Sequence, residues 1–193
     1  MHPNNQRWWA YCKKIYPEYF QSKKVIELGS FNVNGTIRAF FEKDCIYTGV
    51  DWRAGPCVDI VSLVHELKTD EKFDTVVSAS MLEHDKHHDK TIEKMIALLD
   101  DKGIMILSFG TKSNVRPHCP DEAVDGGYHP VGREIYRILL EGGLYIHEFR
   151  YMHKFLGCEA ANLPEGGEMM IIAFRDQTLA RGKQIIDEFE AGD

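Results

Sequence analysis

A turn between Gly29 and Gly35 is the first place in the sequence where the backbone could come close to a ligand. Glycine-rich turns cradle phosphate groups when their glycines have the right spacing. The dinucleotide fingerprint would place glycines where this chain has Phe31 and Asn34, and a P-loop would place lysine where it has Thr36. Neither phosphate-binding motif is present.

Acidic side chains flank this turn and follow the next apolar segment. Glu27 lies two positions before Gly29, where a carboxylate repels phosphate and favours a cationic group such as an amine. Asp51 follows Gly29 by 22 residues, at the carboxyl end of a predicted strand, where an acidic side chain can accept hydrogen bonds from both hydroxyls of a ribose. Trp52 could cover an adenine face. An isolated acidic residue after a strand is equally often a helix cap or turn former.

Seven segments have the composition of strands, with turn-forming residues between them. They are 24–28, 46–50, a short 58–61, 73–78, 104–108, 145–151 and 168–175. The segment 104–108 is apolar almost throughout, as expected of a strand that is buried on both faces of a parallel sheet. Because helical segments alternate with these strands, the sequence predicts an α/β fold.

Helical periodicity begins near the N-terminus. Trp9, Cys12, Tyr16 and Tyr19 recur at spacings of three and four, which predicts an amphipathic helical cap within residues 1–22 that Pro17 kinks or ends. Further helices are expected at 37–41, 92–99, 131–140 and 185–189, and a turn is expected at 100–103. No linker or repeat divides the sequence, so residues 1–193 are expected to form a single domain.

The composition argues against several classes of partner. Lys and Arg number 23 and Asp and Glu number 30, which gives a net charge of −7, so we expect neither nucleic acid nor an anionic membrane as a partner. The five cysteines show no C-x-x-C spacing and are odd in number, which favours a reducing compartment. The first twenty residues contain no long apolar run. A cytoplasmic protein is therefore expected.

Three stretches resemble the successive strand-end motifs of class I S-adenosylmethionine-dependent methyltransferases, of the methyltransferase type 11-like kind. They are VIELGS at 25–30, YTGVDW at 47–52 and FDTVVSASMLEH at 73–84, in the order and spacing of that family. The resemblance is strongest over residues 23–110. It implies a Rossmann-like, doubly wound sheet of about seven strands, and the last two strands would match the family's terminal antiparallel hairpin.

The resemblance also implies S-adenosylmethionine as cofactor and S-adenosylhomocysteine as product. Carried over to this sequence, Glu27 and Gly29, with Ser30 beside them, would contact the amino acid part of the cofactor. Asp51 would contact the ribose, and Trp52 would contact the adenine.

The sequence departs from the family pattern at two positions. Phe31 stands where the family usually has a second glycine, and residues 32–35 take over the turn. After the short strand at 58–61 the family often has an acidic residue for the adenine amino group, where this chain has Ser62. Backbone groups or Ser62 would then bind the adenine.

Histidines gather in segments expected to face the cofactor cleft or its rim, at positions 84, 87, 88, 118 and 129. A metal site is conceivable, but polar runs of this kind are usually solvated loop and cap residues, so no metal is predicted. His84 ends the third motif, which lies near the methyl group in the resembling enzymes. We expect it to be either a general base or a structural residue.

Residues 111–130 are expected to form a long loop after the fifth strand. This segment has three prolines and no periodicity, and it is far longer than an ordinary βα connection. Its charged and aromatic side chains are candidates for contact with a substrate: Arg116, His118, Tyr128 and His129. The alternative is a surface excursion with no ligand role.

The sequence thus predicts a methyltransferase that acts on an oxygen or nitrogen of an unidentified, small-molecule acceptor. A non-catalytic cofactor-binding or regulatory protein with the same fold is the main alternative. A nicotinamide-dependent enzyme is disfavoured because Phe31 and Asn34 replace the required glycines. Oligomeric state is not predicted.

Overall fold

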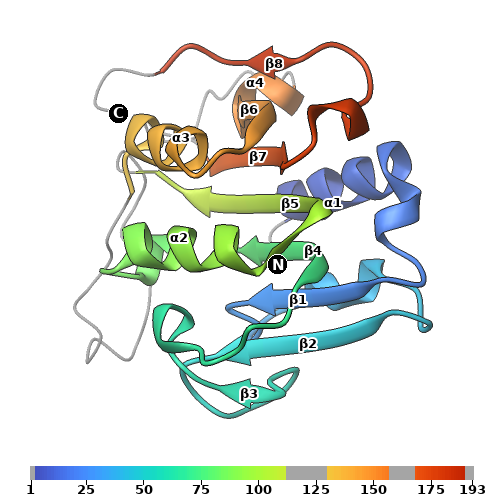
Figure 1. Ribbon diagram of the computed structural model, residues 1–193, viewed down its shortest axis with the longest axis vertical. Helices are drawn as coiled ribbons and strands as arrows, with labels where there is room; N and C mark the ends of the chain where they lie inside the picture. The colour runs from blue at the N-terminus through green and yellow to red at the C-terminus, as the bar shows by residue number, and fades with distance from the viewer. Residues whose placement is uncertain (1–2, 112–129, 157–167, 190–193) are drawn as a thin grey trace.

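The residues that the computed structural model describes, 3–111, 130–156 and 168–189, are organised around one mixed sheet of eight strands (Figure 1). The strand order is β3-β2-β1-β4-β5-β7-β6-β8. The strands are β1 (Lys24–Leu28), β2 (Ile46–Asp51), β3 (Ile60–Val61), β4 (Phe73–Ala79), β5 (Leu99–Gly110), β6 (Tyr145–Tyr151), β7 (Glu168–Phe174) and β8 (Ile185–Ile186).

The first five strands are parallel, with β1 between β2 and β4. In β5, residues 103–110 are all buried, as the near-continuous apolar pattern predicted for a parallel strand covered on both faces. Parallel strands end at the same edge of a sheet. Gly29, Asp51, Ser80 and Gly110 therefore lie along one edge, because each ends or directly follows one of the strands β1, β2, β4 and β5.

The last strands form the antiparallel hairpin that the resemblance implied. β7 pairs antiparallel with both β5 and β6 and lies between them. The predicted Rossmann-like, doubly wound α/β architecture is thus confirmed. The predicted seven strands are all present, and β8 adds an eighth.

Helices cover both faces of the sheet (Figure 1). They are α1 (Pro3–Ile15), α2 (His88–Leu98), α3 (Gly132–Glu141) and the short α4 (Met152–Leu156). α2 and α3 pack in front of the sheet and α1 packs behind it, which gives a separate apolar core on each face. The four residues of the predicted N-terminal stripe are all buried, and α1 ends two residues before Pro17. Within the described ranges, no helix has the length and apolar character needed to cross a membrane.

Three local predictions were wrong. The helix expected at 37–41 is only a 3-10 turn, η2 (Ile37–Phe40). The turn expected at 100–103 lies inside β5, where the register with β4 shifts. The helix expected at 185–189 is instead β8, which pairs parallel with β6. Ile185 and Ile186 are β-branched and meet an open strand edge, so tertiary pairing outweighs their helical spacing.

Short 3-10 turns connect the remaining elements: η1 (Pro17–Tyr19), η3 (Val64–Glu66), η4 (Leu82–His84) and η6 (Gln177–Leu179). Of these, η4 follows β4 directly and projects from the edge where the parallel strands end. It brings the third sequence motif to the same edge as the glycine turn after β1.

Candidate functional site

The turn after β1 is a close approach between two parts of the backbone. Gly29 has a φ of +85°, and a Cβ built on it would lie 2.5 Å from Cβ of Met81, the residue before η4. The backbone N–H groups of Gly29 and Ser30 both donate to Val50 O, at 2.8 and 3.0 Å. Only glycine satisfies this combination of backbone angle and contact. The predicted turn is therefore wedged between the ends of β1, β2 and β4.

Asp51 fixes the turn from the end of β2. Its side chain is 7% exposed, and its two carboxylate oxygens accept from Phe31 N at 3.1 Å and from Arg53 N at 3.3 Å. An ionised carboxylate has about four acceptor positions, so about two remain for a ligand. That arrangement suits two neighbouring hydroxyl groups, as on a ribose.

Glu27 is buried on β1, with 3% of its surface exposed, and its Oε2 accepts from the Tyr47 hydroxyl at 2.8 Å. The pKa of Glu27 is raised to about 8, mainly by burial and also by the nearby carboxylates of Asp51 and Asp59, whereas Tyr47 and Arg38 act to lower it. A cation bound beside these carboxylates would favour the ionised form of Glu27. The preference of this site for a cationic ligand group stays a prediction.

Arg38 links this carboxylate group to the backbone of β2. Its guanidinium lies 3.3 Å from Asp59 Oδ2, donates to Tyr47 O at 3.2 Å and stacks over the Tyr47 ring. Asp59 in turn accepts from Gly49 N at 2.7 Å. Sequence reasoning missed this network, although Tyr47 and Gly49 lie within the second motif, beside Asp51.

Trp52 and Ser62, the two residues predicted to bind the adenine, make different contacts near Asp51. Trp52 is 43% exposed, and Arg53 lies over both its ring and the Phe31 ring, at 5.4 and 4.0 Å from the ring centroids. Ser62 donates its backbone N–H to Asp51 O and its hydroxyl to Leu63 O, both at 2.9 Å. An aromatic and guanidinium surface thus borders the end of β2.

Ser30 is buried with 1% exposure, and its Oγ has no hydrogen-bond partner among the residues that the structure describes. A buried hydroxyl without a partner carries a desolvation penalty, which a ligand group at the turn would remove. Ser30 stands one residue after Gly29 and therefore lies in the same turn at the end of β1.

His84 closes η4, where its backbone N–H donates to Met81 O at 2.9 Å. Its side chain is half-buried. Because Met81 touches the position of Gly29, η4 begins at the glycine turn and His84 stands three residues beyond it. Arg116, His118, Tyr128 and His129, with most of the predicted loop 111–130, lie outside the described residues.

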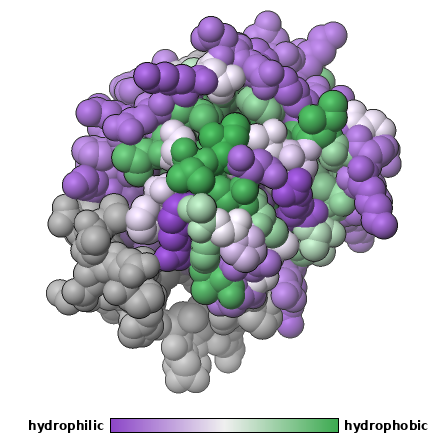
Figure 2. Space-filling view, turned by 90° about the horizontal axis from the view of Figure 1, so that it is seen from below, coloured by the Kyte–Doolittle hydropathy of each residue, from purple (hydrophilic) through white to green (hydrophobic). Residues whose placement is uncertain are grey.

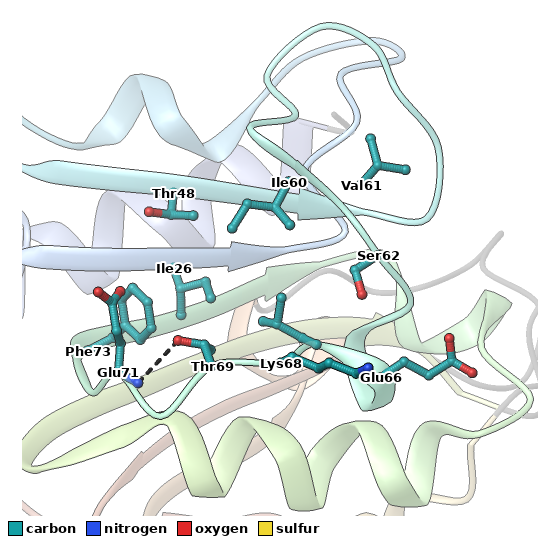
Figure 3. A pocket seen from close by; sticks show the side chains of 11 residues that line it. Ile26, Thr48, Ile60, Val61, Ser62, Glu66, Lys68, Thr69, Glu71 and Phe73 are labelled. Carbon is teal, nitrogen blue, oxygen red and sulfur yellow. Dashed lines mark hydrogen bonds between the residues drawn. The ribbon is translucent and has the colours of Figure 1, made fainter.

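A pocket of about 800 Å³ opens elsewhere, on the face formed by β1, β2 and β3 (Figure 3). Ile26 lines it, and because side chains alternate along a strand, the adjacent Glu27 faces the other side of the sheet. Ser62 is its one member among the predicted site residues. The edge strand β3, which lines the pocket, exposes Ile60 and Val61, and the view from below shows hydrophobic surface there among polar groups (Figure 2). The pocket is not the predicted cofactor site.

Across the described ranges, no three His, Cys, Asp or Glu side chains are grouped so as to hold a metal ion. The rings of His65 and His87 are in contact, with centroids 4.8 Å apart. Both histidines of the 111–130 segment lie outside those ranges.

The strand order, the terminal hairpin and the glycine turn at the sheet edge together define the fold of class I S-adenosylmethionine-dependent methyltransferases. No protein-family model and no curated protein matches this sequence. Solved structures with this fold do match this chain, although their sequence identity to it is low.

Three of these structures illustrate the likeness. The 1,6-didemethyltoxoflavin-N1-methyltransferase of Burkholderia thailandensis, solved with its substrate and S-adenosylhomocysteine, is 16% identical, with a TM-score of 0.64 over 89% of this chain and 77% of its own. The magnesium protoporphyrin IX methyltransferase of Synechocystis, solved with S-adenosylmethionine, is 15% identical, with a TM-score of 0.61 over 90% and 80%. The N-methyltransferase NodS of Bradyrhizobium japonicum is 15% identical, with a TM-score of 0.60 over 89% and 96%.

Proposed function

We propose that this protein binds S-adenosylmethionine at the edge formed by β1, β2 and β4 and transfers its methyl group to a small-molecule acceptor. The observation that carries the proposal is Asp51, a buried carboxylate with acceptor positions to spare at the end of β2, beside a turn that only Gly29 can form. Structures with the same fold are solved with this cofactor or its product.

The residues of the site fit the cofactor. Asp51 would bind the ribose hydroxyls, and Trp52 with the Arg53 and Phe31 pair would border the adenine. Glu27 and the Ser30 hydroxyl would stabilise the amino acid part with its ammonium group. The backbone of Gly29, which has no side chain of its own, would lie against it.

When bound, the cofactor supplies an electrophilic methyl group on a sulfonium. The protein's contribution is then to hold an acceptor atom in line with that methyl and to exclude water. Met81 and η4 stand next to the turn on the β4 side, opposite Asp51, so the acceptor would lie there. We propose that His84 borders it.

Calorimetric titration of the protein with S-adenosylmethionine and with NAD tests the proposal. We expect one S-adenosylmethionine per chain and no heat with NAD. Transfer of a labelled methyl group to a panel of small alcohols and amines would then separate an enzyme from a protein that only binds the cofactor. Binding of NAD in preference to S-adenosylmethionine would contradict the proposal.

A further inference from the structure

Four polar side chains from distant parts of the sequence meet beside the glycine turn. Asn5 on α1 donates through Nδ2 to Glu168 Oε1 at the start of β7 and to Ser80 Oγ after β4, both at 3.3 Å. Glu83 on η4 completes the group. We call Asn5, Ser80, Glu83 and Glu168 the acid cluster.

Gly110, the last residue of β5, connects the two carboxylates. Its backbone N–H donates to the Glu83 carboxylate, and a Cβ built on it would lie 3.8 Å from Cβ of Glu83. It is also the register partner of Glu168. Neither Glu83 nor Glu168 forms an ion pair with a Lys, Arg or His of the described residues. Two acidic side chains are thus held close together without a cation from the described part of the chain.

Three oxygens of the acid cluster are buried and receive no hydrogen bond from any residue that the structure describes. They are Asn5 Oδ1, Glu83 Oε2 and Glu168 Oε2. Asn5 is 2% exposed and Glu83 is 8% exposed. When both glutamates are ionised, all three oxygens are acceptors, so the partner that they lack is a donor. An ammonium group has three N–H donors and a positive charge, whereas a hydroxyl offers one donor and no charge.

The acid cluster lies on the acceptor side of the proposed cofactor site. Ser80 directly precedes Met81, which contacts the position of Gly29. In the sheet, β4, β5 and β7 follow one another on one side of β1, and Asp51 lies at the end of β2 on the other side. A ligand held at Asp51 and Gly29 would therefore meet, at its far end, a group bound by the acid cluster.

We propose that the acid cluster binds the amino group of a primary or secondary amine, which is the methyl acceptor, and takes up the proton that this group must lose. The inference rests on the proposed methyltransferase function and narrows its acceptor from oxygen or nitrogen to nitrogen.

For a primary amine, proton transfer precedes methyl transfer. The acceptor arrives as R–NH₃⁺ and gives one proton to a carboxylate of Glu83 or Glu168, which leaves R–NH₂ with a free lone pair. That pair forms the bond to the methyl carbon while the carbon–sulfur bond breaks and its electrons stay on sulfur. The products are R–NH₂⁺–CH₃ and S-adenosylhomocysteine, and the carboxyl proton passes to solvent when the site opens. Burial raises the pKa of Glu83 to about 8 and that of Glu168 to about 7, which makes both better proton acceptors than ordinary carboxylates.

The test uses the protein saturated with S-adenosylhomocysteine and three probes that share a benzyl group: benzylamine, benzyl alcohol and the bulkier benzyltrimethylammonium. Calorimetry near neutral pH should show benzylamine binding at least tenfold more tightly than either of the others, because only it carries both charge and N–H donors. Equal affinities for benzylamine and benzyl alcohol, or no binding of benzylamine, would overturn the inference. A protein that does not bind S-adenosylhomocysteine would instead overturn the proposed function.

Variants then test whether the acid cluster causes the preference for benzylamine. Glu83→Gln and Glu168→Gln should each reduce the preference for benzylamine at least fivefold while leaving the affinity for S-adenosylhomocysteine within twofold, which also shows that the variants fold. Glu134→Gln removes an exposed glutamate on α3 and should change neither. If both cluster variants keep the full amine preference, the acid cluster is not the amine site.

Discussion

A Cβ on Gly29 would lie 2.5 Å from Cβ of Met81, so the turn after β1 and the segment after β4 are in contact only because residue 29 is glycine. Gly143 offers a comparison within the same chain. It also has a positive φ, +78°, but apart from its own chain neighbours no atom of the described residues stands within 4 Å of the position of its Cβ. Both glycines would show the cost of backbone strain when substituted, but only Gly29 would also show the cost of steric contact.

Gly29→Ala should destabilise the protein more than Gly143→Ala. At Gly143 the loss in unfolding free energy is the left-handed backbone penalty of about 1–2 kcal/mol. At Gly29 the overlap with Met81 adds about 1–3 kcal/mol. Denaturant unfolding measures both. In a Met81→Gly background, which removes the Cβ that would overlap, the extra loss at position 29 should disappear, and equal losses at the two glycines in the wild-type background would show that the contact is not tight.

Stability should fall as pH rises toward the mildly alkaline range. Burial raises the pKa of Glu27 from 4.5 to about 8, so the folded protein binds more protons than the unfolded chain between these values. The stabilising effect of protonated Glu27 is complete below pH 4.5 and is lost as pH rises through about 8. Glu83 and Glu168 act in the same direction.

Glu27→Gln should therefore flatten the decline of unfolding free energy with pH, while the exposed control Glu134→Gln leaves it unchanged. Urea unfolding at several pH values between 4.5 and about 8 measures the slope of unfolding free energy against pH. A slope that is identical in wild type and Glu27→Gln would mean that Glu27 titrates normally in the folded state.

His84→Ala should lower the rate of methyl transfer by less than about tenfold and leave cofactor affinity within twofold. The reason is that His84 stands three residues beyond Met81, bordering the proposed acceptor side, while the acid cluster receives the proton. Loss of a general base lowers rates by about 10²–10⁴-fold. A decrease of that size in steady-state turnover would assign the proton transfer to His84 and remove it from Glu83 and Glu168.

The succession of the central strands along the chain and the residues at their ends were predictable because each depends on a short stretch of sequence. Asp51 follows a run of strand-forming residues, and Gly29 ends another, so their place at one sheet edge needed only the parallel topology. The segment at 185–186 was misjudged because its pairing partner, β6, is more than thirty residues earlier in the chain. Local periodicity does not report such pairing.

The acid cluster was out of reach of sequence reasoning for the same reason. Asn5 and Glu168 are 163 positions apart, and Glu83 was noticed only as part of the third motif. Nothing in the types or spacing of these residues indicates that they meet. Their proximity results from the position of β7 beside β5 and of α1 behind the sheet.

Calorimetric titration of S-adenosylhomocysteine into wild type, Asp51→Asn and Asp74→Asn tests the central claim most directly. Asp74 also accepts a backbone N–H, from Lys24 at 2.8 Å, but it lies on β4 near the opposite edge of the sheet, so Asp74→Asn controls for general destabilisation. Charge-assisted hydrogen bonds are worth about 1.5–3 kcal/mol each. We expect one S-adenosylhomocysteine per chain, an affinity at least tenfold weaker in Asp51→Asn, and an unchanged affinity in Asp74→Asn. No binding to wild type, or equal binding to wild type and Asp51→Asn, would contradict the proposed cofactor site.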